Sequence, residues 1–153
     1  MTKFNLRPMV DEDIDTVVDM CFKFFEQTKY TEVMLFEHGH LAAVLHNLVR
    51  SDDFLGVVAE DTKTGGIAGF ITAIAVPHTL CNTTLANEQG WWVEPQYRGT
   101  SVWLQLINFY QDWAREKGCL TATIGAAEGV TNLERVLPRL GYTKTDSTWM
   151  KRL

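Results

Sequence analysis

The sequence predicts an α/β fold with a mixed sheet, because helical and strand patterns alternate along its 153 residues. Apolar residues recur at helical spacing in some segments, whereas others are short runs rich in aromatic and β-branched residues bounded by turn-forming residues. There is no internal repeat, low-complexity tract or linker. This length fits one domain with a single core, so residues 1–153 are expected to form one domain.

The N-terminal third is predicted to contain a short strand followed by two helices. Residues 4–7 alternate apolar and polar side chains, as a strand does. Residues 11–27 open with three acidic residues, which suit the first turn of a helix, and then keep apolar residues at helical spacing. A second helix is expected over residues 41–49, whose leucines and Val44 form an apolar stripe.

Three strands are expected next. Residues 54–59 and 67–76 are apolar runs separated by a polar turn rich in threonine and glycine, the pattern of a β-hairpin. Pro77 ends the second of these strands, since proline has no N–H for the ladder. A further strand is expected over residues 85–93.

The C-terminal part is predicted to alternate helix and strand. A long helix begins at residue 101 or 102 and ends at Gly118, and a strand covers residues 120–126. A helix is expected over residues 128–140, with two strands after it, the last over residues 149–153. The whole order gives about seven strands flanked by four helices.

The stretch from Trp91 to Gly118 carries the clearest functional signal. Pro95 stops the strand, and Gly99 permits a tight turn before the long helix. Thr100 and Ser101 are candidate N-caps. The N–H groups at the start of that helix, with Arg98 beside them, predict an anion site suited to phosphates.

Composition excludes several classes of function. A net charge of −5 argues against broad nucleic-acid binding, which needs a basic surface, and no run approaches the length of a membrane span. Three widely spaced cysteines fit reduced thiols, and the N-terminus lacks a signal peptide, so a soluble cytoplasmic protein is expected. His38 and His40 have no partner at metal-ligand spacing, so no metal is expected.

The order of elements, with the central motif Val-Glu-Pro-Gln-Tyr-Arg-Gly at residues 93–99, resembles the GNAT superfamily of acyl-CoA-dependent N-acyltransferases. The resemblance covers nearly the whole chain and includes Arg-Leu-Gly-Tyr at residues 139–142. The short Arg-Gly-Thr-Ser form is similar to that of phage-type members. The resemblance implies the GNAT fold and an N-acetyltransferase that moves the acetyl group of acetyl-CoA to a small-molecule or peptide primary amine.

In such proteins two strands splay apart, the pantetheine arm lies in the gap, and the pyrophosphate binds to the loop that follows. The resemblance therefore implies a set of cofactor-binding residues: Trp92, Val93, Arg98, Gly99, Thr100, Ser101, Val102 and Trp103. It implies Glu88 as the catalytic base acting through water, the other interpretation being a solvated glutamate at a strand edge. Glu94 is expected to be exposed, and Tyr97, Tyr142 and Cys119 to be packing residues.

Three positions depart from the family pattern. Ser101 replaces a glycine, Trp103 stands where glycine or alanine is usual, and Leu137 replaces the tyrosine that often protonates the leaving thiolate. These departures keep open a second hypothesis, a catalytically degenerate binding or structural protein in which the Trp103 indole fills the pyrophosphate position. Acceptor identity is not encoded in a readable motif. Residues 28–40 and 78–84 are the expected acceptor loops, and homodimers are common in the family.

Overall fold

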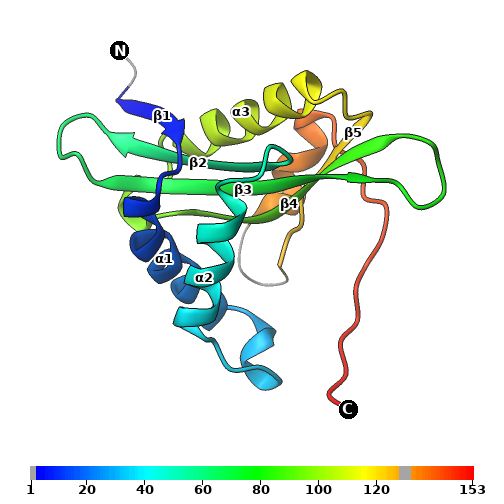
Figure 1. Cartoon of the computed structure of the whole chain (residues 1–153), viewed down its shortest axis with the longest axis horizontal. Helices are drawn as coiled ribbons and strands as arrows, with labels where there is room; N and C mark the ends of the chain where they lie inside the picture. The colour runs from blue at the N-terminus through cyan, green and yellow to red at the C-terminus, as the bar shows by residue number, and fades with distance from the viewer. Residues whose placement is uncertain (1–2, 128–131) are drawn as a thin grey trace.

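The computed structural model describes residues 3–127 and 132–153 and contains a five-stranded mixed sheet in the order β1-β2-β3-β4-β5 (Figure 1). The first four strands pair antiparallel, and β5 joins β4 in parallel. The strand bounds are β1 Phe4–Pro8, β2 Phe54–Asp61, β3 Ile67–Pro77, β4 Thr84–Val93 and β5 Thr121–Thr123.

The helices form layers on both faces of this sheet. Helices α1 (Ile14–Glu26) and α2 (His38–Leu48) cover one face, and α3 (Val102–Glu116) covers the other (Figure 1). A short α4 (Leu133–Val136) follows β5. Single-turn 3-10 helices lie at Asp11–Asp13, Lys29–Glu32, Pro95–Tyr97 and Leu137–Leu140.

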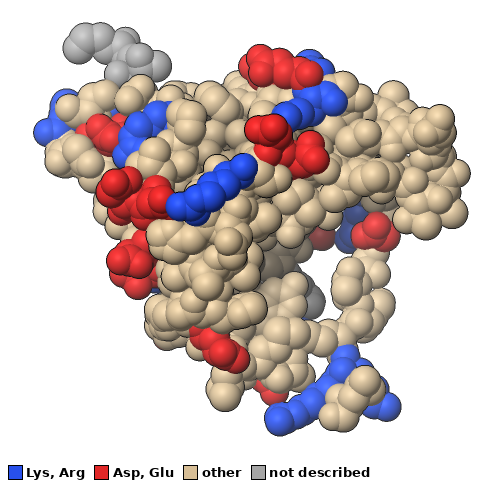
Figure 2. Space-filling model, in the orientation of Figure 1, with Lys and Arg blue, Asp and Glu red and all other residues tan. Residues whose placement is uncertain are grey.

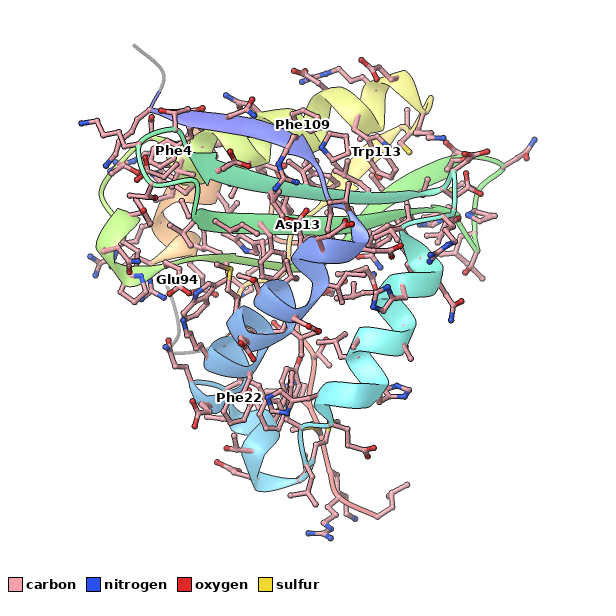
Figure 3. All side chains as sticks on the ribbon, turned by 60° about the vertical axis from the view of Figure 1, so that its left-hand side comes forward. Phe4, Asp13, Phe22, Glu94, Phe109 and Trp113 are labelled. Atoms are coloured by element: carbon pink, nitrogen blue, oxygen red, sulfur yellow. The ribbon has the colours of Figure 1, made fainter. Side chains whose placement is uncertain are left out.

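Each face of the sheet has its own hydrophobic cluster. Residues such as Val57, Ile71 and Leu106 pack between the sheet and α3, while Val58, Phe70 and Val17 pack between the sheet and α1. Figure 3 shows Phe109 and Trp113 on the α3 side and Phe22 on the α1 side. Burying a side chain such as Ile71 contributes roughly 1.5–3 kcal/mol to folding, so these two clusters hold the three layers together.

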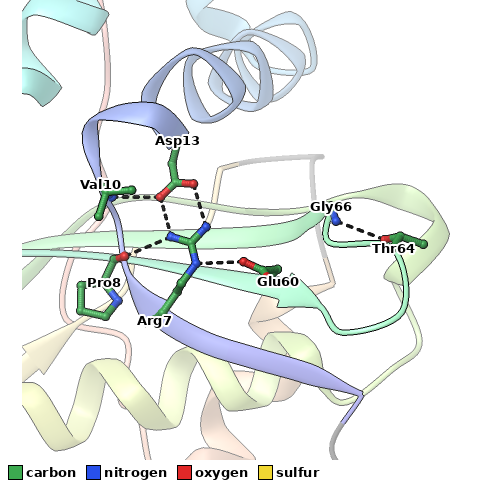
Figure 4. Close-up of polar contacts among 7 residues, drawn as sticks. All are labelled: Arg7, Pro8, Val10, Asp13, Glu60, Thr64 and Gly66. Atoms are coloured by element: carbon green, nitrogen blue, oxygen red, sulfur yellow. Dashed lines mark hydrogen bonds and ion pairs between the residues drawn. The ribbon is translucent and has the colours of Figure 1, made fainter.

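An ion pair between Arg7 and the buried Asp13 connects the start of α1 to the sheet. The Arg7 guanidinium on β1 donates to both carboxylate oxygens of Asp13 at 2.7 and 2.9 Å, and its Nε donates to Glu60 at 2.9 Å (Figure 4). Asp13 also accepts the Val10 N–H at 2.9 Å. Burial alone would raise the pKa of Asp13, but the bonds from Arg7 and Val10 lower it overall. These contacts connect the 3-10 turn before α1 to β1 and β2.

Two predictions about the C-terminal part are wrong. Residues 142–153 contain no strand, so the described chain has five strands instead of about seven. Trp149 is 93% exposed, and Figure 2 shows basic side chains on an extended segment that stands away from the body. The pattern of residues 149–153 suits a strand, but those residues find no ladder partner, and a strand needs one.

The other predicted elements are largely confirmed, with shifted ends. The first helix begins as a 3-10 turn at Asp11–Asp13, and α2 starts at His38 rather than residue 41. The strand expected over residues 120–126 is shortened to β5. The helix expected over residues 128–140 is the short α4 with a 3-10 turn after it, and residues 128–131 lie outside the described part.

No helix within residues 3–127 and 132–153 combines the length and the apolarity needed to cross a bilayer.

Candidate active site

Strands β4 and β5 pair over a short stretch and then diverge. Their parallel register has three pairs and ends at Asn87↔Thr123. From Glu88 to Val93, β4 pairs with β3 alone in the described structure. One edge of β4 therefore presents backbone groups that no strand occupies, and an extended ligand arm can bond to such an edge.

A β-bulge in β4 sets which side chains face which layer. The register passes from Thr72↔Gly90 to Ala73↔Glu88, so Gln89 is the extra residue. Directly paired residues share a face of the sheet. Glu88 therefore lies on the α3 face with Ala73, and Trp91 lies there opposite Ile71.

The bulge precedes Trp91 and Trp92, so these two residues face opposite layers as a regular strand requires. Trp92 pairs with Phe70 and packs in the cluster beneath α1, with its ring 6.4 Å from Phe24. Its Nε1 is buried and has no hydrogen-bond partner among the described residues.

The Glu88 carboxyl lies at the point where the two strands diverge. Its side chain is half-buried, and Oε2 accepts the backbone N–H of Gly125, two residues beyond β5, at 3.0 Å. Burial raises the pKa of Glu88 from its ordinary value of 4.5 to about 7, and the Gly125 bond partly opposes the rise. A carboxyl that titrates near neutral pH is suited to general-base chemistry.

The loop after β4 leaves several backbone donors without partners. Gly99 has φ of +90°, a conformation that glycine adopts without strain, and it turns the chain into α3. Among the described residues, no hydrogen-bond acceptor is found for the N–H groups of Gly99, Ser101, Trp103 and Leu104. Four unpaired donors at a helix start form an anion-binding environment.

The cap of α3 differs from a simple serine cap. Ser101 occupies the N-cap position, but its hydroxyl caps no backbone N–H and accepts from the Gln105 amide at 2.9 Å. Thr100 supplies the cap instead, since its Oγ1 accepts the Val102 N–H at 3.4 Å and donates to Tyr97 O at 2.7 Å. The Ser101 N–H itself has no acceptor among the described residues.

Arg98 is held in place by contacts that leave its two Nη atoms free. Its Nε donates to Val93 O at 3.0 Å, and its guanidinium lies 4.4 Å from the centroid of the Trp92 ring. In the described structure neither Nη atom has a hydrogen-bond partner. The free edge of the guanidinium is the part that binds phosphate oxygens as a fork.

Trp103 packs inward. Its side chain is half-buried against the cluster between the sheet and α3, next to the fully buried Val102. A large side chain at this position thus contributes to the core beneath α3.

Glu94 was predicted to be exposed but is buried. It is only 8% exposed, and its carboxylate receives Lys23 Nζ of α1 at 2.5 Å (Figure 3). The Glu94 N–H donates to Ala68 O, which keeps the residue in line with β4 and places it under α1. Lys23 lies 71 residues away in the chain, so no local pattern indicates this ion pair.

The remaining candidates are packing residues in this structure. Tyr97 OH donates to Asp61 at 2.9 Å, and Tyr142 OH accepts from Gln111 at 3.0 Å. Burial raises the pKa of both Tyr142 and Cys119. Leu137 lies in the last 3-10 turn.

His38 belongs to an aromatic cluster at the C-terminal end of α1 and the start of α2. Its ring lies 5.0 Å from Phe22 and 4.8 Å from Phe36, and the Phe25 ring lies 5.4 Å from Phe36 in a tilted arrangement. Within the described residues there is no group of three or more metal-ligating side chains.

One residue of this region belongs to no motif that the sequence shows. Tyr110 lies in the long helix that the sequence predicts, and its hydroxyl is 2.9 Å from Ala86 O and 2.9 Å from Thr123 O. A tyrosine on a buried face usually finds a hydrogen-bond partner, which is the one signal available beforehand.

Known structures share this architecture. The chain aligns with a transcriptional regulator from Bacillus halodurans at 16% identity and a TM-score of 0.80, covering 98% of this chain and 99% of the other. It aligns with the aminoglycoside N-acetyltransferase AAC(6')-Iy, bound to a bisubstrate analogue, at 19% identity and a TM-score of 0.79, covering 99% of both chains. Glucosamine-6-phosphate N-acetyltransferase from Arabidopsis thaliana aligns at 13% identity and a TM-score of 0.77, covering 98% of both chains.

At these identities the three likenesses establish the fold. No curated protein sequence matches the chain. The sequence does match the model of the acetyltransferase (GNAT) family over residues 15–142, a span that includes β4, the Arg98 loop and β5. The chain therefore belongs to the GNAT family of acetyltransferases.

Proposed function

We propose that the chain transfers an acetyl group from acetyl-CoA to a primary amine. The observation that carries the proposal is the combination of unpaired loop N–H groups and the free Nη atoms of Arg98 at the open edge of β4. Two structural neighbours are named as N-acetyltransferases of amino sugars or aminoglycosides, which supports an amine acceptor.

The proposed roles follow the order of groups in the donor. The pyrophosphate takes the loop N–H groups and the Arg98 fork, and the pantetheine arm follows the unpaired edge of β4. The proposed binding set is Trp92, Val93, Arg98, Gly99, Thr100, Ser101, Val102 and Trp103. In this set Trp92 acts by holding Arg98, and Trp103 acts through its unpaired backbone N–H. Val102 acts by anchoring the start of α3, since its side chain is buried and its N–H is bonded to Thr100 Oγ1.

Acetyl transfer requires the amine to lose a proton while it attacks the thioester carbon and the C–S bond breaks. We assign the proton to Glu88 through water, because this carboxyl titrates near neutral pH at the divergence of β4 and β5. A backbone N–H near Val93 would stabilise the charge on the acetyl oxygen. The thiolate departs without a tyrosine at residue 137, which its ordinary pKa permits.

A second candidate is a GNAT-like binding protein without catalysis, favoured by Leu137 at the position of the usual general acid. The packing of Trp103 argues against a protein in which the indole blocks the pyrophosphate position, because the indole contributes to the core. Acceptor size and class follow from neither hypothesis. A net charge of −5 supports a cationic small molecule or peptide amine.

Thermal and urea denaturation with acetyl-CoA tests donor binding directly. A ligand at about 100 times its dissociation constant stabilises the folded state by about 2.7 kcal/mol. Release of free CoA thiol in the presence of a panel of amines then tests transfer. Stabilisation without thiol release would favour a protein that binds the donor without catalysis. No stabilisation at millimolar acetyl-CoA would refute the proposed transferase and favour the catalytically degenerate protein.

A further inference from the structure

Tyr110 stands out because it is fully buried and its hydroxyl contacts both strands of the candidate site. The residue lies in α3 and is 0% exposed. Its oxygen is 2.9 Å from Ala86 O of β4 and 2.9 Å from Thr123 O of β5. A phenol has one proton, so its O–H lies between two carbonyl acceptors. Burial raises the pKa of Tyr110, which keeps the hydroxyl protonated and donating at neutral pH.

These two carbonyls lie where the β4–β5 ladder ends. The last two register pairs are Ala86↔Ala122 and Asn87↔Thr123. A second side-chain contact joins the same strands, since Thr123 Oγ1 lies 3.0 Å from Asn87 Oδ1. A ladder of three pairs is a weak attachment for an edge strand, so the side-chain bonds contribute a large share of what holds β5 there.

The next residues along both strands carry the candidate base. Glu88 follows Asn87 directly, and Gly125 lies two residues beyond Thr123. The Gly125 N–H reaches Glu88 Oε2 at 3.0 Å. The hydroxyl of Tyr110 therefore fixes the strand end from which Gly125 extends.

We propose that Tyr110 is a positioning residue for acetyl transfer, whose hydroxyl sets the point where β4 and β5 part and so holds the Gly125 N–H against the Glu88 carboxyl. The inference rests on the proposed function, in which Glu88 is the base. Gly125 faces Glu88 from the β5 side, and Tyr110 faces it from α3. Tyr142 and Cys119 face Tyr110 in turn.

The consequence is a change in how Glu88 titrates. The Gly125 bond lowers the pKa of Glu88 against the effect of burial. Without the hydroxyl, β5 moves off β4, the bond lengthens and the carboxyl keeps its proton to higher pH. One lost backbone bond should raise the midpoint by about half a unit to one unit.

Tyr110→Phe tests this with the ring retained. In the pH profile of kcat/KM, we expect the acidic limb to move to higher pH by about half a unit to one unit. Activity at pH 7 should then fall about threefold. Acetyl-CoA affinity should change less than about twofold, because the Arg98 loop lies elsewhere. Tyr97→Phe is the control for loss of a tyrosine hydroxyl: it removes a half-buried hydroxyl bonded to Asp61 at 2.9 Å, away from Glu88, and should leave the acidic limb in place.

Carbon-detected NMR of the Glu88 carboxyl separates this inference from the proposed function, because it needs no turnover. In the wild type the Gly125 amide proton should titrate with the same midpoint as Glu88, and Tyr110→Phe should weaken that coupling and raise the midpoint. An unchanged Glu88 midpoint in folded Tyr110→Phe protein would overturn the role of Tyr110. A shifted midpoint in a protein that transfers no acetyl group would leave the positioning role standing and refute the proposed function.

Discussion

Glu88→Gln should make the folded protein more stable above neutral pH while it lowers acetyl transfer. Glu88 is half-buried, and burial raises its pKa to about 7 from an ordinary 4.5. The folded state then binds the Glu88 proton more tightly than the unfolded state does. The stability that this proton contributes is fully present below pH 4.5 and is lost as pH rises through 7.

The size of the effect follows from the shift. A difference of 2.5 pKa units between 4.5 and 7 corresponds to about 3 kcal/mol at 1.36 kcal/mol per unit. Glutamine has nearly the same volume and keeps an oxygen for the Gly125 N–H, but it carries no charge. The variant should therefore match the wild type near pH 4 and exceed its free energy of unfolding by up to about 3 kcal/mol at pH 8.

Urea denaturation at pH 4, 6 and 8 measures this difference directly. Glu116→Gln on the exposed end of α3 is a matched control for the effect of an amide in place of a carboxylate. A difference between Glu88→Gln and the wild type that stays constant from pH 4 to 8 would refute the reasoning, since it would place the carboxyl in ordinary solvent.

Three further outcomes are expected. Arg98→Ala should weaken acetyl-CoA binding, measured by calorimetry, by about 1.5–3 kcal/mol, the usual contribution of a charge-assisted bond, while Arg115→Ala, which breaks an exposed pair, should leave affinity unchanged. Gly69→Ala should lower stability in urea by about 1–3 kcal/mol, because its Cβ would lie 2.5 Å from Trp92 O; an unchanged midpoint would show that β3 and β4 separate freely. Trp149→Ser should change the free energy of unfolding by less than about 0.5 kcal/mol, since the side chain is 93% exposed, and a larger loss would mean that this segment packs.

Local patterns predicted most of the fold. The helices and the hairpin of β2 and β3 follow from periodicity and turn residues within short windows, and their residues keep those patterns in the structure. The failures came at the C-terminal end. Residues 149–153 have the composition of a strand, but pairing is decided by whether another strand is available, which a local pattern does not contain.

The candidate site also has some features that local sequence predicts and others that depend on tertiary contacts. The turn at Gly99, the start of α3 and the cation at Arg98 are consecutive in the chain, so their types and spacing indicated an anion site directly. The inward packing of Trp103 was left undecided by the sequence, because a large residue there can turn either way. The bulge at Gln89 likewise depends on pairing with β3.

Sequence alone determined the family, the order of the elements and the loop that follows β4, because those depend on residues near one another in the chain. Tertiary structure decided the environments of the ionisable groups. Glu94 is buried by α1 and paired with a lysine 71 residues away, and Glu88 is desolvated where β4 and β5 part. Tyr110 joins carbonyls of two strands that local patterns could not bring together. Burial and pairing across the fold set charge and basicity, and these are properties of packed neighbours rather than of residue order.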